Sequence, residues 1–178
     1  MRIISGTLKG KHLKIPKNIK VRPTTDRSKE ALFNVLNNRF DFNKIIVLDL
    51  FSGTGAISFE FSSRGAKTVY SVDKNYNSIK FIKSFSIENN LNIKAIKADI
   101  FKYKPQFYLQ FDIIFADPPY SYKEDYYNEL ISIIKKKLDN SKGSLLILEH
   151  PETIIFKKDK NVLERRKYGG CSFTFFIL

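Results

Sequence analysis

Short apolar stretches that alternate with helical patterns constrain the fold of this chain more than any other feature of its sequence. Five stretches rich in β-branched and aromatic residues are typical of buried strands: residues 44–50, 67–72, 93–98, 111–116 and 144–148. Apolar spacing of three or four residues predicts four helices: from about Arg27 to Phe40, up to Arg64-Gly65, over 75–89 and over 126–138. Strands separated by helices pair in parallel through right-handed crossovers. The sequence therefore predicts an α/β chain with a mainly parallel sheet.

The carboxyl-terminal part of the chain departs from this alternation. Residues 161–168 and 172–178 are typical of two strands, and Tyr168-Gly169-Gly170 lies between them. Too few residues separate the two runs for a helix, so they must pair in antiparallel fashion. A closing hairpin is therefore expected, which brings the sheet to seven strands.

The amino-terminal part also departs from it. Residues 2–5 and 11–15 are short β-like runs on either side of a glycine-containing turn. Residues 1–29 carry nine basic side chains and one acidic one. We expect residues 1–24 to form a basic β-hairpin extension that contacts phosphates, ahead of a larger domain over residues 25–178. A solvated edge whose lysines discourage aggregation is the alternative.

A glycine-containing loop, Asp49-Leu50-Phe51-Ser52-Gly53-Thr54-Gly55, follows the first predicted strand. Glycines let the backbone approach a ligand closely, and the second predicted strand ends in Asp73, where an acid can accept both hydroxyls of a ribose. A nicotinamide dehydrogenase shares these features, but its fingerprint requires a third glycine where this chain has Ser58. Asp49 would also face the phosphates of a dinucleotide. The loop therefore favours a nucleoside cofactor without a pyrophosphate.

The tetrapeptide Asp117-Pro118-Pro119-Tyr120 stands at the carboxyl end of the fourth predicted strand, the edge where open α/β sheets bind ligands. A carboxylate and the carbonyl of the next proline are two acceptors on a stiff backbone. If both N–H groups of a planar amine are held by them, the nitrogen lone pair leaves ring conjugation and can attack an electrophile. Tyr120 offers a face for stacking a base, worth ~1–3 kcal/mol. A proline-stiffened loop with a tyrosine over the core is the structural alternative.

The composition indicates the kind of partner. A net charge of +13 and a pI near 9.7 favour a polyanion, of which nucleic acid is the commonest and an anionic membrane surface the alternative. A single cysteine, Cys171, excludes an internal disulfide and favours a reducing compartment. No Cys/His cluster has metal-ligand spacing, and no apolar run approaches the ~20 residues that span a bilayer. We expect a cytoplasmic protein without a metal, in which His12, His150 and Cys171 are structural.

The tetrapeptide matches the (Asp/Asn)-Pro-Pro-(Tyr/Phe) signature of methyltransferases that act on amino nitrogens of bases. The whole chain resembles the RsmD family, bacterial enzymes that methylate the N2 amine of a guanine in 16S ribosomal RNA. The segments that carry the resemblance are Met1–Gly6, the Lys9-Gly10-Lys11 turn, Arg22–Arg27 leading to Glu30–Asn34, Asp49–Gly55 and Asp117–Tyr120. The chain departs from the family at Ser28-Lys29, where a more hydrophobic or arginine-bearing pair is usual, and at Tyr168-Gly169-Gly170-Cys171.

The resemblance implies a class I S-adenosylmethionine-dependent methyltransferase, a Rossmann-like fold with a seven-stranded, mainly parallel sheet. It implies that S-adenosylmethionine is held in three parts: the methionine by the glycine loop, the ribose by Asp73, and the adenine by Asp99 and Ile100. The cofactor-binding residues implied are Asp49, Phe51, Ser52, Gly53, Gly55, Asp73, Asp99 and Ile100.

The resemblance also implies where the RNA is held. Asp117 and the Pro118 carbonyl would hold the guanine amine, Pro119 would fix the turn, and Tyr120 would stack on the flipped base. Phosphates would be held by Arg2, Lys9, Lys11, Arg22, Thr24 and Arg27. The implied substrate is 16S ribosomal RNA, in a small-subunit particle, and the protein is expected to be a monomer.

Two other functions stay open at this point. A DNA adenine-N6 or cytosine-N4 methyltransferase uses the same tetrapeptide, although no separate stretch of the chain is large enough to read a DNA sequence. A nucleic-acid-binding protein that keeps the fold without catalysis is the second, and the intact Asp117, Tyr120, Gly53 and Gly55 argue against it.

Overall fold

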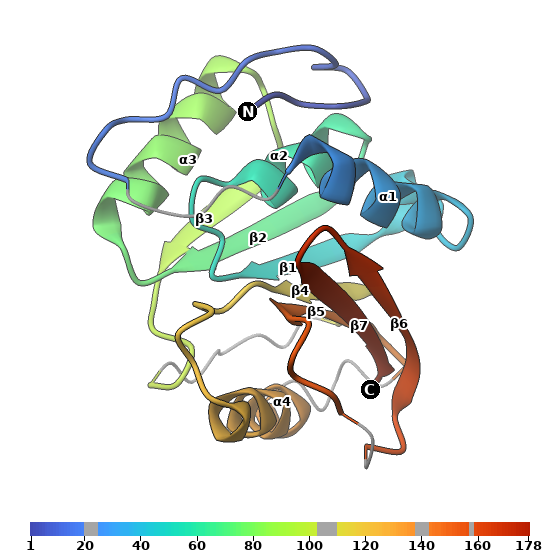
Figure 1. Ribbon diagram of the computed structural model, residues 1–178. Helices are drawn as coiled ribbons and strands as arrows, with labels where there is room; N and C mark the ends of the chain where they lie inside the picture. The colour runs from blue at the N-terminus through green and yellow to red at the C-terminus, as the bar shows by residue number, and fades with distance from the viewer. Residues whose placement is uncertain (20–24, 103–109, 138–142, 157–158) are drawn as a thin grey trace.

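The centre of the molecule is a twisted sheet between two layers of helices (Figure 1). The computed structural model describes residues 1–19, 25–102, 110–137, 143–156 and 159–178. Within these ranges the sheet has seven strands in the order β3-β2-β1-β4-β5-β7-β6. The strands are β1 Ile46–Leu50, β2 Thr68–Asp73, β3 Ile93–Lys97, β4 Ile113–Ala116, β5 Leu145–Pro151, β6 Val162–Tyr168 and β7 Cys171–Ile177.

Strands β1 to β5 are parallel, and β7 runs antiparallel between β5 and β6. The predicted α/β fold with a mainly parallel sheet and a closing hairpin is therefore confirmed. Because strand order reverses between β1 and β4, the loops that leave these two strands diverge and leave room for a ligand at their carboxyl ends.

The helices lie on both faces of the sheet. Helices α1 (Asp26–Asn37), α2 (Ala56–Ser63) and α3 (Tyr76–Glu88) cover one face, α4 (Glu124–Lys137) covers the other, and a short turn of 3₁₀ helix, η1 (Phe42–Lys44), precedes β1 (Figure 1). In the described ranges, no helix is long and apolar enough to cross a bilayer.

Helix α1 is shorter than its apolar pattern predicts. The hydroxyl of Thr25 caps its start by accepting the N–H of Ser28 at 3.1 Å. At the other end, the N–H groups of Arg39 and Phe40 both donate to the carbonyl of Leu36, which closes the helix at Asn37. Phe40 still packs against the core, so the apolar spacing correctly predicted its contact but not its helical state.

The strands divide the core into two layers because successive side chains point to opposite faces. Val47 and Ile113 face α1 and α2, whereas Leu48 and Ile114 face α4. A third cluster joins Ile3 and Leu13 to Phe59 of α2 and to α3. The amino-terminal residues are therefore packed onto the helices by apolar side chains of their own.

The predicted amino-terminal strands form much less sheet than expected. Arg2 and His12 make a single antiparallel bridge, with hydrogen bonds of 3.0 Å from Ile3 N–H to the Lys11 carbonyl and from Leu13 N–H to the Met1 carbonyl. The ladder stops there because the next donors are used elsewhere. The N–H groups of Ile4 and Ser5 donate to the carboxylate of Glu60 at 2.9 and 3.1 Å.

A buried lysine fastens the same segment to α1. Lys29 has no exposed surface; its ammonium donates to the carbonyl of Arg2 at 2.5 Å and pairs with Asp26 at 3.3 Å. Asp26 also pairs with Arg2 at 3.1 Å. Burial alone would raise the pKa of Asp26, but the charges of Lys29 and Arg2 outweigh it and hold that pKa below its usual value. The unusual Ser28-Lys29 pair thus includes a structural cation.

Candidate active site

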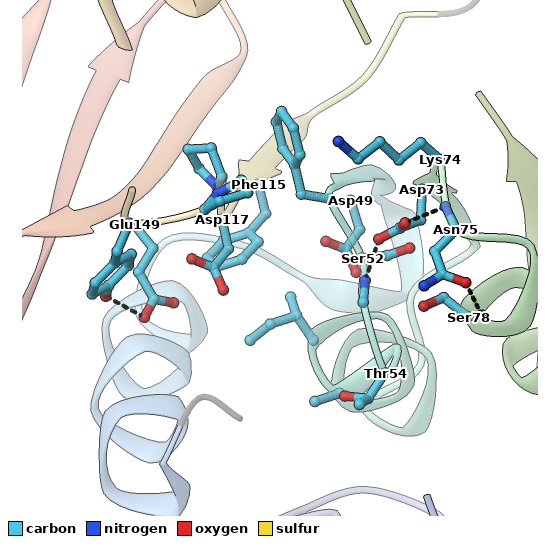
Figure 2. A pocket seen from close by; sticks show the side chains of 17 residues that line it. Asp49, Ser52, Thr54, Asp73, Lys74, Asn75, Ser78, Phe115, Asp117 and Glu149 are labelled. Atoms are coloured by element: carbon cyan, nitrogen blue, oxygen red, sulfur yellow. Dashed lines mark hydrogen bonds between the residues drawn. The ribbon is translucent and has the colours of Figure 1, made fainter. Parts of the chain in front are cut away.

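A cavity of about 430 Å³ opens at the carboxyl ends of β1, β2, β4 and β5 (Figure 2). It brings together the glycine loop after β1 and the Asp117–Tyr120 loop after β4. Nine of the predicted site residues line it: Asp49, Phe51, Ser52, Gly53, Asp73, Asp117, Pro118, Pro119 and Tyr120. A ligand held by the glycine loop would therefore reach the tetrapeptide without leaving the cavity.

A second, smaller cavity of about 40 Å³ extends the first one toward β3. Asp99 and Ile100 line it, together with Phe101 and Tyr122. The two cavities share Phe51, Asp73 and Lys74. The two cavities therefore lie next to each other along the ends of β1, β2 and β3, where the methionine, ribose and adenine parts of the cofactor are expected.

The glycine loop reaches its position through an unusual backbone. Phe51 has a φ of 59°, a left-handed conformation that costs a residue with a side chain of order 1–3 kcal/mol. Gly55, at the start of α2, has a φ of 77°, and a Cβ there would lie 2.7 Å from Cγ1 of Ile82. Gly55 does not line the cavity. It instead lets α2 begin against α3, and so places the loop.

Asp73 is oriented by the backbone on both sides. One carboxylate oxygen accepts the N–H of Gly53 at 2.8 Å, and the other accepts the N–H of Asn75 at 2.7 Å (Figure 2). A carboxylate offers about four acceptor sites, so both oxygens keep capacity for a ligand's hydroxyl groups. The side chain therefore links the glycine loop to the start of α3 and still faces the cavity.

Asp49 is almost completely buried, with 1% of its surface exposed. The hydroxyl of Ser58 donates to its carboxylate and also contacts the hydroxyl of Ser71. Burial raises the pKa of Asp49 to about 7, the charge of Asp73 adds to the rise, and the hydrogen bond from Ser58 opposes it. Ser58 replaces the third glycine of a dinucleotide fingerprint, and here its hydroxyl serves the acid of the loop.

Tyr120 and Glu149 form the far wall of the cavity. The phenol of Tyr120 donates to Oε1 of Glu149 at 3.1 Å (Figure 2). Burial raises the pKa of Tyr120 strongly, and the charges of Glu149 and Asp117 raise it further. The phenol consequently stays protonated throughout the range in which proteins work, and the ring cannot act as a general base.

Acidic side chains follow the carboxyl edge of the sheet from strand to strand. Asp99 follows β3, Asp73 ends β2, Asp49 lies near the end of β1, Asp117 follows β4 and Glu149 lies near the end of β5. The first three lie on the side of the glycine loop, and the last two on the side of the tetrapeptide. Despite the chain's net charge of +13, the floor of the site is thus lined with acids.

The sequence analysis did not single out several cavity residues. Glu149 is the most informative of them, because it follows the predicted strand 144–148 just as Asp73 and Asp99 follow theirs; the same rule would have found it. Lys74, Asn75 and Ser78 also line the cavity from the start of α3, and Phe115 from β4. No local signal separated these four from ordinary helix and strand residues.

The predicted RNA-binding residues do not gather at the cavity. Arg2, Lys9, Lys11 and Arg27 are exposed, whereas Arg22 and Thr24 lie outside the described residues. Lys11 contacts Asn89 beyond the end of α3, eleven residues from Ser78, which is about 16 Å along a helix. Arg27 instead lies in the first turn of α1.

Two buried hydroxyl groups allow a test of whether the site fits S-adenosylmethionine. Among the described residues, Oγ of Ser52 and Oγ of Ser78 are buried without a hydrogen-bond partner, and both residues line the larger cavity. Buried polar groups are normally paired, so these two indicate a polar ligand between the glycine loop and α3. The acidic floor also suits a cofactor that carries a sulfonium and an ammonium group. The residues present fit that cofactor.

The fold and this site define a class I S-adenosylmethionine-dependent methyltransferase. A family model described as conserved hypothetical protein 95 matches residues 1–177. The chain therefore belongs to this family, the RsmD family of methyltransferases, as its sequence motifs predicted.

Known proteins are similar to the chain over most of its length. The ribosomal RNA small subunit methyltransferase D of Buchnera aphidicola subsp. Baizongia pistaciae is 30% identical, over 86% of this chain and 78% of that protein. The uncharacterized methylase RP545 of Rickettsia prowazekii is 29% identical, over 95% and 94%. The solved structure of hypothetical protein TTHA0928 from Thermus thermophilus superposes with a TM-score of 0.82 at 26% identity, covering 100% of this chain and 99% of that one.

Proposed function

We propose that this protein transfers the methyl group of S-adenosylmethionine to the exocyclic N2 amine of a guanine in 16S ribosomal RNA. The observation that carries the proposal is the single cavity lined by both Gly53 and Tyr120, because a methyl carbon must pass between two molecules bound in one space. Family membership supports the choice of RNA, as does the name of the Buchnera relative, a small-subunit ribosomal RNA methyltransferase.

Different residues would bind the methionine, ribose and adenine parts of S-adenosylmethionine. Asp49 would pair with the ammonium of the methionine part, and the hydroxyl of Ser52 and the backbone of Gly53 would bind its polar groups. Asp73 would accept the ribose hydroxyls, and Asp99 the adenine amine, with Ile100 against the ring. S-adenosylmethionine supplies a methyl group on a sulfonium, so transfer needs neither a metal nor a covalent enzyme intermediate.

The tetrapeptide Asp117–Tyr120 would hold the guanine with its N2 amine in position for methylation. The Asp117 carboxylate and the Pro118 carbonyl would each accept one N–H of the N2 amine, Pro119 would fix the turn, and Tyr120 would support the face of the base. Transfer would form a C–N bond as the C–S bond of the sulfonium breaks, and the Asp117 carboxylate, which holds the amine, would accept the proton that the nitrogen then loses. The main contribution of the enzyme is the positioning of the two reactants.

The RNA would be held outside the cavity by the basic amino-terminal residues 1–24, of which Arg2, Lys9 and Lys11 are exposed, and by Arg27. Since Lys11 lies at the far end of α3, the RNA would extend well beyond the target base. We propose 16S RNA within a small-subunit particle as the substrate and a cytoplasmic monomer as the active form.

The test is a transfer assay with purified protein, labelled S-adenosylmethionine, and either naked 16S RNA or small-subunit particles that lack the modification. Digestion to nucleosides and mass analysis should find N2-methylguanosine. Asp117→Ala should lower turnover by at least about 100-fold while binding of S-adenosylhomocysteine stays close to that of the wild type. Label found on DNA alone, or on a base other than guanine, would reject the proposal.

A further inference from the structure

Glu149 lines the part of the cavity next to Asp117 and Tyr120, which we call the base pocket, and the sequence analysis gave it no role. It lies near the end of β5, and β5 pairs in parallel with β4 with Leu148 opposite Ala116. The next residues along the chain are Glu149, still in β5, and Asp117, directly after β4, so the two acids lie side by side where neighbouring strands are about 5 Å apart. Figure 2 shows both carboxylates on the same wall of the cavity, on the far side from Thr54 and Ser78.

The carboxylate of Glu149 acts as an acceptor in this structure. Its residue is 5% exposed, and its Oε1 accepts the phenol of Tyr120 at 3.1 Å. A carboxylate accepts about four hydrogen bonds, so this contact orients Glu149 without using up its capacity. Both acids line the cavity, so a base that enters beside Asp117 can present one N–H group to each carboxylate.

The chemistry of the bases distinguishes between the possible substrates. Guanine carries a donor, N1–H, directly beside its N2 amine. Adenine has N1 beside its N6 amine and cytosine has N3 beside its N4 amine, and both of these ring nitrogens are acceptors. A carboxylate next to Asp117 therefore attracts guanine and repels the other two bases.

We propose that Glu149 is a specificity-determining residue of the base pocket, which accepts the N1–H of the target guanine while Asp117 holds the neighbouring amine. The inference rests on the proposed function, since it assigns a second acid of the same pocket to the same base. The contact with Tyr120 holds the Glu149 carboxylate beside the ring on which the base would stack.

The affinities of four nucleosides distinguish the contact of Glu149 with N1–H from the contact of Asp117 with the 2-amino group. Guanosine carries both N1–H and the 2-amino group, inosine has only N1–H, 2,6-diaminopurine riboside has only the 2-amino group beside an N1 acceptor, and adenosine has neither. Their affinities are measured by ligand-detected NMR on protein saturated with S-adenosylhomocysteine. The wild type should bind guanosine about 10- to 100-fold more tightly than 2,6-diaminopurine riboside.

Two substitutions show which residue is responsible for each nucleoside preference. Glu149→Gln keeps an oxygen for Tyr120 but adds a donor, so it should shrink the guanosine-over-diaminopurine preference at least about tenfold and leave the guanosine-over-inosine preference in place. Asp117→Asn should reduce the guanosine-over-inosine preference and leave the guanosine-over-diaminopurine preference in place. Glu129→Gln, on the exposed side of α4, removes the same charge away from the cavity and should change neither ratio.

The outcomes separate the inference from the proposed function. Wild-type protein that binds guanosine no more tightly than 2,6-diaminopurine riboside overturns the inference, even if it methylates guanine in ribosomal RNA. A preference that survives in Glu149→Gln also overturns it. Protein that shows the preference, loses it in Glu149→Gln, and yet leaves guanine N2 of 16S RNA unmethylated supports the role of Glu149 and rejects the proposed function.

Discussion

Asp49 illustrates how much one residue's surroundings alter its chemistry. Its carboxyl lies beneath the glycine loop with 1% of its surface exposed, and burial, assisted by the charge of Asp73, raises its pKa to about 7. An acid in that range is partly protonated at neutral pH. Pairing with a cationic ligand would favour the carboxylate, so ligand binding should release a proton.

The affinity for S-adenosylmethionine should therefore depend on pH. Below pH 7 the carboxyl of Asp49 is mostly protonated and must ionise before it can pair with an ammonium, so affinity should fall about tenfold for each pH unit. Above pH 7 the profile should level off. Calorimetry from pH 5.5 to 8.5 checks this, and Asp49→Asn should bind more weakly with a flatter profile. A wild-type profile as flat as that of the variant would contradict the assigned role.

His150 should make the stability of the protein depend on pH in the mildly acidic range. It is fully buried, its Nδ1 and Nε2 lie 2.8 Å from the Pro151 carbonyl and 2.7 Å from the Thr174 hydroxyl, and burial lowers its pKa to about 4. Between pH 4 and 6.5 the unfolded chain binds a proton that the folded chain does not. Stability should thus fall as the pH drops through that window, by about 3 kcal/mol in total.

Urea unfolding at a series of pH values measures this effect. Other groups also titrate in the same range, so the informative quantity is the difference between wild type and His150→Gln. The variant should be less stable at pH 7 and should lose less stability on acidification. Parallel pH profiles for the two proteins would show that His150 is not the group responsible.

At the scale of elements, helix α2 connects the cofactor site to the amino-terminal segment. It begins beside the cavity at Ala56, and its fully buried Glu60 accepts the N–H groups of Ile4 and Ser5 and pairs with Arg64 at 2.8 Å. The sequence pattern did not indicate this contact, because the partners are more than fifty residues apart.

Replacing Glu60 with alanine should release the segment from α2. Two backbone donors and the partly buried Arg64 would lose their partner, which should cost about 3–5 kcal/mol of unfolding free energy. Hydrogen exchange of the Ile4 and Ser5 amides should accelerate strongly. Glu88→Ala, an exposed acid in α3, is the matched control and should leave exchange unchanged. Equal protection of both amides in the two variants would contradict this account.

The elements also show what the sequence could and could not predict. Every strand of the sheet was predicted within three residues at each end, because buried strands here are β-branched runs bounded by polar residues. The amino-terminal hairpin was predicted as two strands and is a single bridge, because Glu60 takes the donors that a longer ladder needs. The motifs were sufficient to find the cavity, but its contributions from α3 depend on packing that no local pattern encodes.

The whole molecule combines a strongly basic chain with an acidic cavity floor. The net charge is +13, yet acids lie at or near the carboxyl ends of five neighbouring strands. Phosphates should be attracted to the outer surface and repelled from the cavity. Affinity for RNA and specificity for the base should therefore respond to different substitutions.

Salt titrations test this separation. RNA affinity should fall steeply with salt, and Lys9→Gln with Lys11→Gln should reduce the slope of log affinity against log salt by about 1.4, or about 0.7 for each lost phosphate contact. Binding of S-adenosylmethionine to the same variant should be unchanged. Lys136→Gln, on α4, is the control on the opposite face. An unaltered slope in the double variant would show that the turn does not contact RNA.

The turn at Gly6 is held by main-chain groups rather than by its lysines. The N–H of Thr7 donates to the Ser63 carbonyl at 2.7 Å, and a Cβ on Gly6 would lie 1.8 Å from that oxygen. The path of the segment is therefore independent of the charges that it carries outward. Related proteins could exchange those outward side chains without refolding the segment, but each would have to keep glycine at position 6.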